Sequence, residues 1–379
     1  MSQLEQADPN IFMPLQTILC CPSSKTPLTF MPLQDLLFRL PESESKRIPL
    51  GTVGAFVSES ALLAYPIIGY IVNFLEQDTL KLSGIQDTTI KSIDSEASEI
   101  KQSVKKWYDE FGWKQNMAGT YNDVALFSQV GETGYRLYEI LSHLSLIDRF
   151  LGGEFLLDAA SGAIASPEYL SYSWSYKYRV CVDISLTALH EANAKLKEKG
   201  FYCLADVCRL PFLDEVFDGV ISGYTIQHIP EEEQSKAVRE LYRVLKPEKH
   251  LCIITNFIPS NKRHVVLRFL HLTRKIAYKF RSDYRTEDDI YKLQNPSNPP
   301  HRLYGFLRDL KWWNKILCDL TTSFSIEKLR FLSKTEFELF FGLSIHAAKL
   351  LHTVENLFPK LLAKISDHIL IDLYKAKRK

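Results

Sequence analysis

The sequence predicts an α/β fold built around a parallel sheet, and three features of residues 155–257 indicate it. Short apolar runs alternate with segments of helical periodicity, in the order of a βαβαβ unit. The first three runs end on the acids Asp158, Asp183 and Asp206. The turn 158–162 consists mainly of small residues, which let a backbone approach a ligand closely. Because ligands of open parallel sheets bind beyond the carboxyl ends of strands, these acids indicate a site for a ligand with hydroxyl and amine groups.

Each element follows from a local pattern. The predicted strands are the apolar runs 155–157, 180–182, 201–205, 217–221 and 251–255. Apolar residues at helical spacing predict a helix over 135–151, which Gly152-Gly153 ends before the first strand. Ser185 is a suitable N-cap for a helix that runs to Gly200. A further helix over 231–245 opens with acids, carries one apolar face and ends at Lys246-Pro247.

The bulk composition is that of a globular protein larger than one ordinary domain. The chain has 379 residues, of which 46% are hydrophobic and 24% charged. A net charge of +1 gives no indication of nucleic-acid binding. Seven cysteines without a repeated spacing argue against a disulfide framework and favour the cytoplasm. The longest apolar stretch, 61–75, is interrupted by Pro66 and Gly69, so we expect no membrane span.

The motifs of the central region carry a family resemblance. They are Asp158-x-Ala160-x-Gly162, Asp183, Asp206 to Phe212, Phe217-Asp218 and Leu241 to Pro247. Their order and spacing resemble the class I S-adenosylmethionine-dependent methyltransferases, most closely the ubiquinone/menaquinone-methyltransferase-like branch. The resemblance implies a Rossmann-like, seven-stranded, mostly parallel sheet with an antiparallel last strand. Residues 324–331 and 368–374 would supply the final strand pair around a helix. A nicotinamide-binding Rossmann fold is the nearest rival, but it lacks the signature that follows Asp206.

The resemblance also implies which residues bind S-adenosylmethionine. The cofactor-binding set would be Asp158, Ala160, Gly162, Asp183, Ile184, Asp206 and Val207. Asp183 would accept hydrogen bonds from the ribose hydroxyls, because a carboxylate can accept from two vicinal hydroxyls. Asp206 would accept from the adenine amine, beside the Val207 backbone. Taken singly, Asp183 could instead cap a helix and Asp206 could form a turn. With Ser185 available as the cap, we expect Asp183 to be free for a ligand.

The glycine loop departs from the usual acid-x-Gly-x-Gly-x-Gly pattern. Ala160 and Ile164 stand where the first and third glycines are usual, and Gly162 is retained. Ala160 is tolerable if its φ is negative, whereas a β-branched residue such as Ile164 is unfavourable at positive φ. We therefore expect a reshaped loop.

The region before the sheet is interpreted as two parts. Residues 1–80 resemble a small zinc-ribbon activator of methyltransferases, but Ser24 stands where the ribbon needs a partner for Cys21. We therefore expect a metal-free β module. Residues 81–130 are interpreted as a helical linker, and its aromatic residues either close over the cofactor or pack as a helix face. The methyltransferase domain would span 131–379.

An insert over 259–320 contains 13 Lys/Arg and 6 Asp/Glu, with interleaved aromatic residues. It is interpreted as a substrate cover that suits an anionic or sugar-bearing acceptor, or as a peripheral contact with lipid headgroups. The alternative is a solvated helical pair.

The predicted function is methyl transfer to a small-molecule, lipid or saccharide acceptor. His228, after the fourth strand, is the candidate general base, with Tyr224 as second choice. His228 could instead only hold a loop by hydrogen bonds. The alternative function is that of a non-catalytic relative acting through protein interaction, which the altered glycine loop favours and which Asp183 and Asp206 oppose. The acceptor atom (oxygen, nitrogen or carbon) and the oligomeric state stay open.

Overall fold

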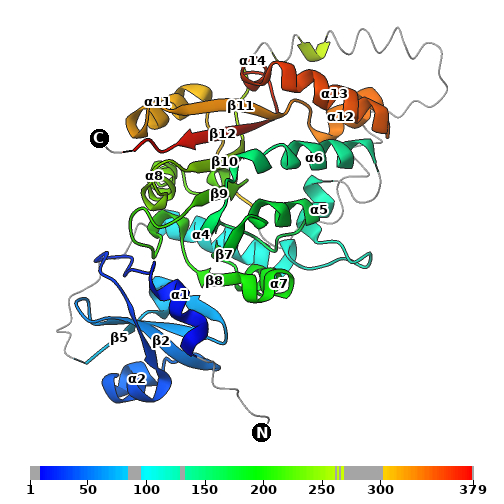
Figure 1. Ribbon diagram of the computed structural model, residues 1–379. Helices are drawn as coiled ribbons and strands as arrows, with labels where there is room; N and C mark the ends of the chain where they lie inside the picture. The colour runs from blue at the N-terminus through cyan, green and yellow to red at the C-terminus, as the bar shows by residue number, and fades with distance from the viewer. Residues whose placement is uncertain are drawn as a thin grey trace.

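The computed structural model describes residues 9–83, 95–128, 133–260, 263, 266–268 and 302–377, and one long sheet runs through it (Figure 1). The strands are β1 (Thr29–Pro32), β2 (Thr52–Ser58), β3 (Leu63–Ile68), β4 (Ile71–Asn73), β5 (Leu80–Lys81), β6 (Gly153–Ala159), β7 (Tyr176–Asp183), β8 (Gly200–Leu204), β9 (Gly219–Gly223), β10 (His250–Asn256), β11 (Phe324–Arg330) and β12 (His368–Tyr374). Their order is β1-β2-β3-β4-β8-β7-β6-β9-β10-β12-β11, and β5 pairs with β3. The predicted α/β class is confirmed.

The seven strands from β8 to β11 form the predicted Rossmann-like sheet. Strands β8, β7, β6, β9 and β10 are parallel to their neighbours in this order. Strand β12 lies between β10 and β11 and is antiparallel to both, as predicted for the last strand. The register pairs Asp158 with Cys181 and Asp183 with Leu204, so the loops after these strands leave at one edge of the sheet.

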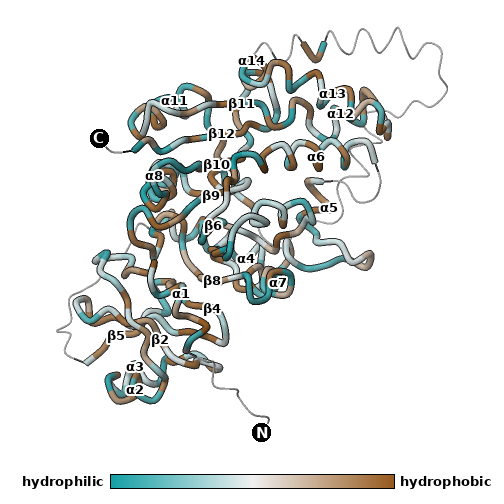
Figure 2. Tube along the Cα trace, viewed as in Figure 1, coloured by the Kyte–Doolittle hydropathy of each residue, from teal (hydrophilic) through white to brown (hydrophobic). Residues whose placement is uncertain are grey.

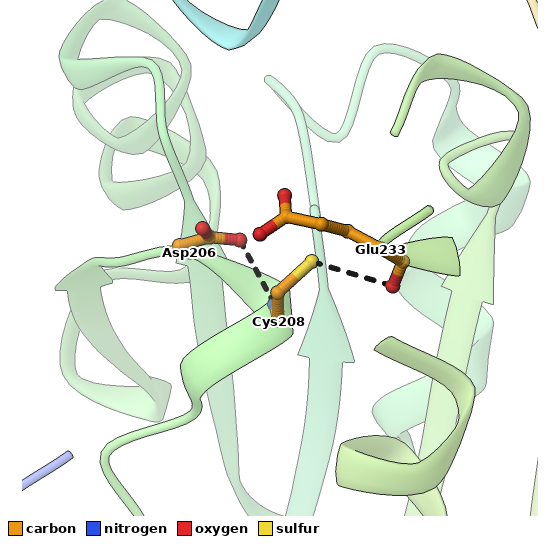
Figure 3. A group of neighbouring side chains, drawn as sticks. All are labelled: Asp206, Cys208 and Glu233. Atoms are coloured by element: carbon orange, nitrogen blue, oxygen red, sulfur yellow. Dashed lines mark hydrogen bonds between the residues drawn. The ribbon is translucent and has the colours of Figure 1, made fainter. Parts of the chain in front are cut away.

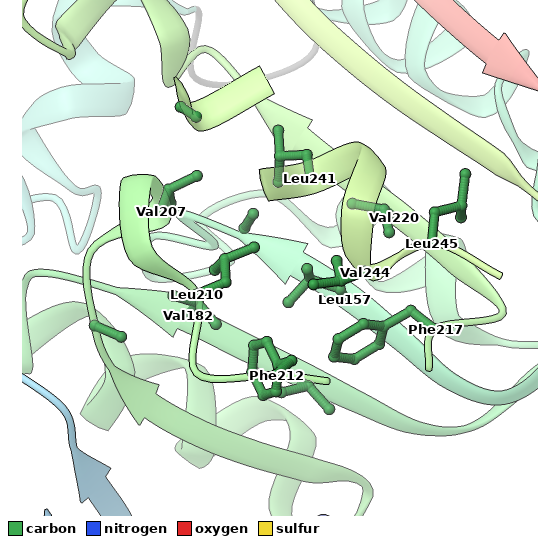
Figure 4. Close-up of a cluster of buried hydrophobic side chains, with 14 of the residues drawn as sticks. Leu157, Val182, Val207, Leu210, Phe212, Phe217, Val220, Leu241, Val244 and Leu245 are labelled. Carbon is green, nitrogen blue, oxygen red and sulfur yellow. The ribbon is translucent and has the colours of Figure 1, made fainter. Parts of the chain in front are cut away.

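Two layers of helices cover this sheet. The α-helices are α1 (Met13–Gln16), α2 (Leu33–Arg39), α3 (Glu42–Ser45), α4 (Ser95–Trp107), α5 (Asn122–Phe127), α6 (Gly134–Leu144), α7 (Leu186–Leu196), α8 (Gln234–Val244), α11 (Leu310–Leu320), α12 (Lys334–Phe341), α13 (Ile345–Leu357) and α14 (Pro359–Ala363). Neighbouring strand residues point to opposite faces, so Leu157 packs in the cluster that includes Leu241 of α8 (Figure 4). Leu156 packs in a second cluster with Leu146 and Phe150, which follow α6.

The N-terminal β module is continuous with the main sheet. Strand β4 pairs in parallel with β8, from Ile71 opposite Tyr202 to Asn73 opposite Leu204. A bridge between Leu19 and Phe212 makes a second contact, and both side chains are fully buried. The module therefore extends the sheet at its β8 edge, an arrangement that the sequence did not predict. This arrangement covers an edge strand that would otherwise expose unpaired backbone groups.

The segment between β11 and β12 also differs from the sequence prediction. Three helices, α12, α13 and α14, stand where one helix was predicted. The hydropathy of the chain alternates along all three (Figure 2). In the described part of the chain, every helix is too short or too polar to cross a bilayer.

The contact between the module and the main sheet yields a stability prediction. Phe212 is buried, and its ring packs edge-on against Phe217 at 4.9 Å between centroids. We expect Phe212→Ala to lower the free energy of unfolding by about 3–5 kcal/mol, because it removes apolar contacts and leaves a cavity. Urea denaturation measures this change. The matched control is Phe38→Ala on α2, where the side chain is 88% exposed and we expect almost no effect. Equal effects of the two substitutions would contradict this account of the contact.

Candidate functional site

A cavity of about 460 Å³ opens at the carboxyl ends of the parallel strands. Its floor consists of the segments that follow β6, β7, β8 and β9, and residues 101–128 line it from the opposite side. Its lining residues include six of the seven predicted cofactor-binding residues: Ala160, Gly162, Asp183, Ile184, Asp206 and Val207. His228 lines the same cavity. Strand order thus brings together residues that are up to 68 positions apart in the sequence, from 160 to 228.

The loop after β6 keeps the backbone that glycines would favour. The φ angles are +57° at Ala160, +54° at Gly162 and +48° at Ile164. Ala160 thus does not have the negative φ under which an alanine would be tolerated without strain. Lys195 holds the loop by donating to the carbonyls of Ala163 (2.5 Å) and Ile164 (3.0 Å). The buried Ile164 side chain offsets a left-handed backbone that costs about 1–2 kcal/mol per residue.

Asp183 is buried at the edge of the cavity and is already hydrogen-bonded. Its Oδ2 accepts from Gly162 N at 2.9 Å and its Oδ1 from Ser185 N at 2.8 Å. The prediction that Ser185 caps the next helix is confirmed, since its side chain accepts from Ala188 N. Burial raises the pKa of Asp183 to about 6, although the two backbone N–H groups act in the opposite direction. Asp183 is thus not wholly free for a ligand, but each of its oxygens keeps a lone pair.

Asp206 belongs to a charged cluster that includes Lys101 of α4. The Lys101 Nζ lies 2.6 Å from Asp206 Oδ2 and also contacts Glu233. Burial acts to raise the pKa of Asp206, but Lys101 and the Cys208 N–H lower it overall. Figure 3 shows Asp206, Cys208 and Glu233 converging, and their ligand atoms lie within 4.8 Å of one another. The Lys101 ammonium already supplies the cation that such a group of acids requires.

Asp158 does not line the cavity, and this corrects its expected position. Its Oδ2 accepts from Arg179 Nη2 at 2.5 Å and from Arg179 Nε at 3.0 Å. Both side chains are buried, and Arg179 Nη1 donates to the Tyr169 carbonyl at 2.6 Å. The carboxylate therefore neutralises a buried arginine of β7. Sequence patterns identified Asp158 as a strand-end acid but could not show that the partner of this acid lies on the neighbouring strand.

Aromatic residues before the main sheet form part of the opposite wall. Tyr108, in the π-helical turn η3 (Tyr108–Gly112), and Trp113 line the cavity and stack at 5.1 Å between centroids. A Cβ at Gly162 would lie 2.6 Å from the Trp113 ring, so only glycine fits beneath it. Trp113 Nε1 is buried without a hydrogen-bond partner in the part of the chain that the structure describes. Trp107, by contrast, is buried in packing, as the alternative interpretation of this segment expects.

His228 holds a loop by a hydrogen bond, which is one of the two roles that the sequence left open. Its Nδ1 lies 2.6 Å from the Tyr304 carbonyl, which can only accept, so Nδ1 carries the proton. The hydrogen bond holds residues 302–308 of the predicted cover against the loop after β9. Burial lowers the pKa of His228, so the imidazole is neutral and its Nε2 is an acceptor. His228 thus fixes a loop and retains a basic nitrogen at the cavity.

The far end of the cavity contains polar residues that the sequence analysis missed. They are Glu139, Arg330, Asp367 and His368. Arg330 donates to Glu139 Oε1 at 3.0 Å and to the Tyr224 hydroxyl at 3.0 Å, while its buried Nε has no partner among the described residues. His368 Nδ1 lies 2.9 Å from Asp367 Oδ2. The sequence contained two signals for these residues. One is the charged Arg330 at the end of β11, and the other is the acid-histidine pair Asp367-His368 at the start of β12.

Two other expectations lie away from the cavity. In the N-terminal module, Cys21 Sγ lies 3.1 Å from the Ser23 hydroxyl and 3.1 Å from the Tyr65 hydroxyl. The likeness of this module to a zinc ribbon, and the absence of metal from it, stay predictions. In the insert, residues 261–262, 264–265 and 269–301 lie outside the described residues. The described segment from Arg302 to Leu320 does not contribute to the cavity lining.

Comparisons with known proteins agree with this arrangement. Residues 157–253 match the family described as "Methyltransferase domain". Over 109 residues the chain is 29% identical to the demethylmenaquinone methyltransferase of Mycolicibacterium paratuberculosis, covering 29% of this chain and 44% of that protein. Over 80 residues it is 34% identical to the ubiquinone/menaquinone biosynthesis C-methyltransferase UbiE of Yersinia enterocolitica, covering 20% and 31%. The chain thus spans less than half the length of these curated relatives.

Among solved structures, phosphoethanolamine N-methyltransferase 1 of Haemonchus contortus has a TM-score of 0.45 and 11% sequence identity to this chain. The similarity covers 75% of this chain and 51% of that one.

The buried pair of Asp158 and Arg179 gives a second stability prediction. We expect Arg179→Met to lower the free energy of unfolding by about 3–5 kcal/mol, because it leaves Asp158 buried and unpaired. The double variant Asp158→Leu/Arg179→Met should regain much of this loss. Lys177→Met is the matched control on the same strand, since its contact with Glu154 is long (3.6 Å) and exposed. Urea denaturation that shows equal losses for Arg179→Met and Lys177→Met would refute the assignment.

Proposed function

We propose that this protein is an S-adenosylmethionine-dependent methyltransferase whose cofactor occupies the cavity at the carboxyl ends of the strands. The observation that carries the proposal is the joint presence of Asp183 and Asp206 in one cavity, at the ends of neighbouring strands. A loop with three residues at positive φ completes the floor beside them. The match of residues 157–253 to a methyltransferase domain supports the same conclusion.

The residues present fit such a cofactor. Asp183 has lone pairs for ribose hydroxyls, and Asp206 with the Val207 backbone would hold the adenine edge. The unpartnered Trp113 Nε1 is a donor beside Gly162, where it suits a carboxylate. When bound, S-adenosylmethionine supplies a methyl group on a positively charged sulfur. Tyr108 and Trp113 would exclude water from that group, and their position facing the strand ends suits this role.

The far end of the cavity would bind the acceptor. Arg330 offers an unpartnered Nε–H, which suits an oxygen with a lone pair and repels a cationic amine. His368 is held neutral, because burial and Arg330 lower its pKa more than Asp367 raises it. The Asp367 carboxylate lies 2.9 Å from Nδ1 without hydrogen-bond geometry, and it would stabilise the charge that proton uptake at Nε2 creates. We therefore assign a hydroxyl-bearing acceptor, with His368 as the general base and His228 as the second candidate.

A non-catalytic protein is the alternative function. Two observations would support it. The Lys101 ammonium is already paired with the Asp206 carboxylate, and the Trp113 ring covers Gly162. A protein of this kind would leave the cofactor unbound. Isothermal titration calorimetry with S-adenosylmethionine separates the two functions, because the methyltransferase requires binding and the alternative does not.

The assignment of Asp183 makes a prediction for cofactor affinity. We expect Asp183→Asn to weaken S-adenosylmethionine binding by roughly 2–4 kcal/mol near neutral pH, since charge-assisted hydrogen bonds are lost. The wild-type affinity should fall as the pH drops through about 6, where Asp183 takes up a proton. Asp123 also lines the cavity, and burial raises its pKa to about 7. Because Asp123 is present in both the wild type and the Asp183→Asn variant, a difference between their pH profiles reports on Asp183. Calorimetry across this pH range measures both effects.

Asp319→Asn is the matched control for this experiment, because Asp319, on α11, is an exposed partner of Arg239 on α8. The role of Asp183 fails if the Asp183→Asn and Asp319→Asn variants bind the cofactor equally well.

The assignment of His368 makes a kinetic prediction. The protein would be incubated with trideuteromethyl-labelled cofactor and a pool of hydroxylated small molecules, and labelled products identified by mass spectrometry. We expect His368→Gln to slow the labelling reaction by about 10²–10⁴-fold, because the general base is lost. Asp367→Asn should shift the pH dependence of the rate. His228→Gln is the comparison variant: if it, and not His368→Gln, abolishes turnover, the base is His228.

A further inference from the structure

The helix α13 carries apolar residues on two opposite sides. Its inner side packs against α6 and α12, where Ala348 and Leu351 join the cluster of Tyr135 and Phe337. Its outer side continues into α14 and forms what we call the outer stripe, whose fractional exposures are Leu350 67%, Val354 47%, Leu357 67%, Phe358 56% and Leu361 67%. Within α13, Leu350, Val354 and Leu357 are three or four positions apart and so share one side of the helix, while Phe358 joins α13 to α14 and Leu361 lies in α14. Figure 1 shows α13 at the rim of the molecule, far from the N-terminal module.

An apolar surface of this kind is unusual for a face that meets only water. Isolated exposed apolar residues are common, but a contiguous row marks an interaction surface. The inner side of α13 already packs against the rest of the protein. The outer stripe is therefore not needed to hold the helix in place. The outer stripe is a surface available to a partner.

The charges around the outer stripe indicate the chemistry of the partner. Residues 343–366 contain one acid, Glu355, which is buried. The Glu355 carboxylate accepts from the Tyr138 hydroxyl at 2.6 Å and lies 3.5 Å from Lys328 Nζ. The bases Lys349, Lys360 and Lys364 are exposed. The surface is thus apolar and basic, and the one acid of this segment faces the interior.

We propose that the outer stripe docks the protein on a membrane surface that contains anionic lipids. Leucine and phenylalanine side chains enter the boundary between headgroups and acyl chains, while lysines remain among anionic headgroups. Each lysine near such a surface adds attraction. A second copy of this chain fits poorly, because a two-fold contact would oppose two basic surfaces. The proposal does not depend on methyl transfer.

The place of the outer stripe relates docking to the cavity. Ser333, Lys334 and Thr335, at the start of α12, line the cavity. Helices α12 and α13 follow each other in the chain, and both pack against α6. A membrane bound by α13 and α14 would therefore lie near the β12-β11 edge of the sheet. The proposed acceptor end of the cavity is at the same edge.

Cosedimentation of the full-length protein with vesicles tests the proposal. The vesicles consist of phosphatidylcholine alone or of phosphatidylcholine with phosphatidylglycerol. We expect binding to the anionic vesicles and a reduction of about tenfold or more for Leu350→Ser/Leu357→Ser, because two apolar side chains no longer enter the bilayer. The matched control is Leu50→Ser, where a 98% exposed leucine of the N-terminal module should leave binding unchanged.

A second set of variants tests the charge contribution. Lys349→Gln, Lys360→Gln and Lys364→Gln should each weaken binding to anionic vesicles by roughly fivefold and reduce its dependence on salt. Lys236→Gln on α8 is the control, an exposed lysine outside the stripe.

Two outcomes would overturn the proposal. In the first, the wild-type protein does not sediment with anionic vesicles, or the leucine and lysine variants sediment as the wild type does. In the second, analytical ultracentrifugation shows a dimer that Leu350→Ser/Leu357→Ser abolishes, which assigns the outer stripe to a second copy. Circular dichroism confirms that the variants are folded, as expected for substitutions of exposed side chains.

Discussion

The hydrogen bond from Gly162 N to Asp183 Oδ2 joins the loop after β6 to the end of β7 at 2.9 Å. It depends on the parallel register of these strands, which brings both loops to one edge of the sheet. It also fixes the left-handed backbone around Gly162, where the Trp113 ring leaves no room for a Cβ. This contact therefore links two segments of the cavity floor beneath the Trp113 ring.

Charges inside the cavity are balanced by residues from distant segments. Lys101 neutralises Asp206 from a helix that precedes the main sheet, and Arg330 lies beside Glu139 from a strand near the C-terminus. Such pairs stay charged in a low dielectric because each ion has a partner and further hydrogen bonds. A ligand that enters must therefore replace or share these contacts. This requirement favours a polar ligand with donors at one end and a lone-pair oxygen at the other.

The N-terminal module and the C-terminal strands β12 and β11 extend the same sheet in opposite directions. The module continues it through β4 and β8, and β11 and β12 continue it on the other side. The central strands are thus protected at both edges, and this keeps the strand ends in a fixed geometry. The cavity lies over the middle of the sheet, while the outer stripe on α13 and α14 lies at its C-terminal side. The proposed ligand site and the proposed docking surface consequently lie in separate parts of the molecule.

The sequence by itself determined the strands, their parallel order and the acids at their ends. The signals for these elements are local: apolar runs, a serine cap at Ser185 and glycines at helix ends. Local signals can be recognised in a single sequence. The sequence also placed Asp183, Asp206 and His228 after strand ends, and all three line the cavity, because parallel strands bring their following residues to one edge of the sheet.

Only the tertiary structure decided what those residues touch. Asp158 meets Arg179 across a strand pair, Asp206 meets Lys101 from 105 positions away, and Arg330 meets Tyr224 from 106 positions away. The positive φ of Ala160 and Ile164 likewise depends on hydrogen bonds from Lys195 and on burial, which override the local preference of these residues. Contacts between distant segments depend on how the whole chain packs, and no local pattern encodes them.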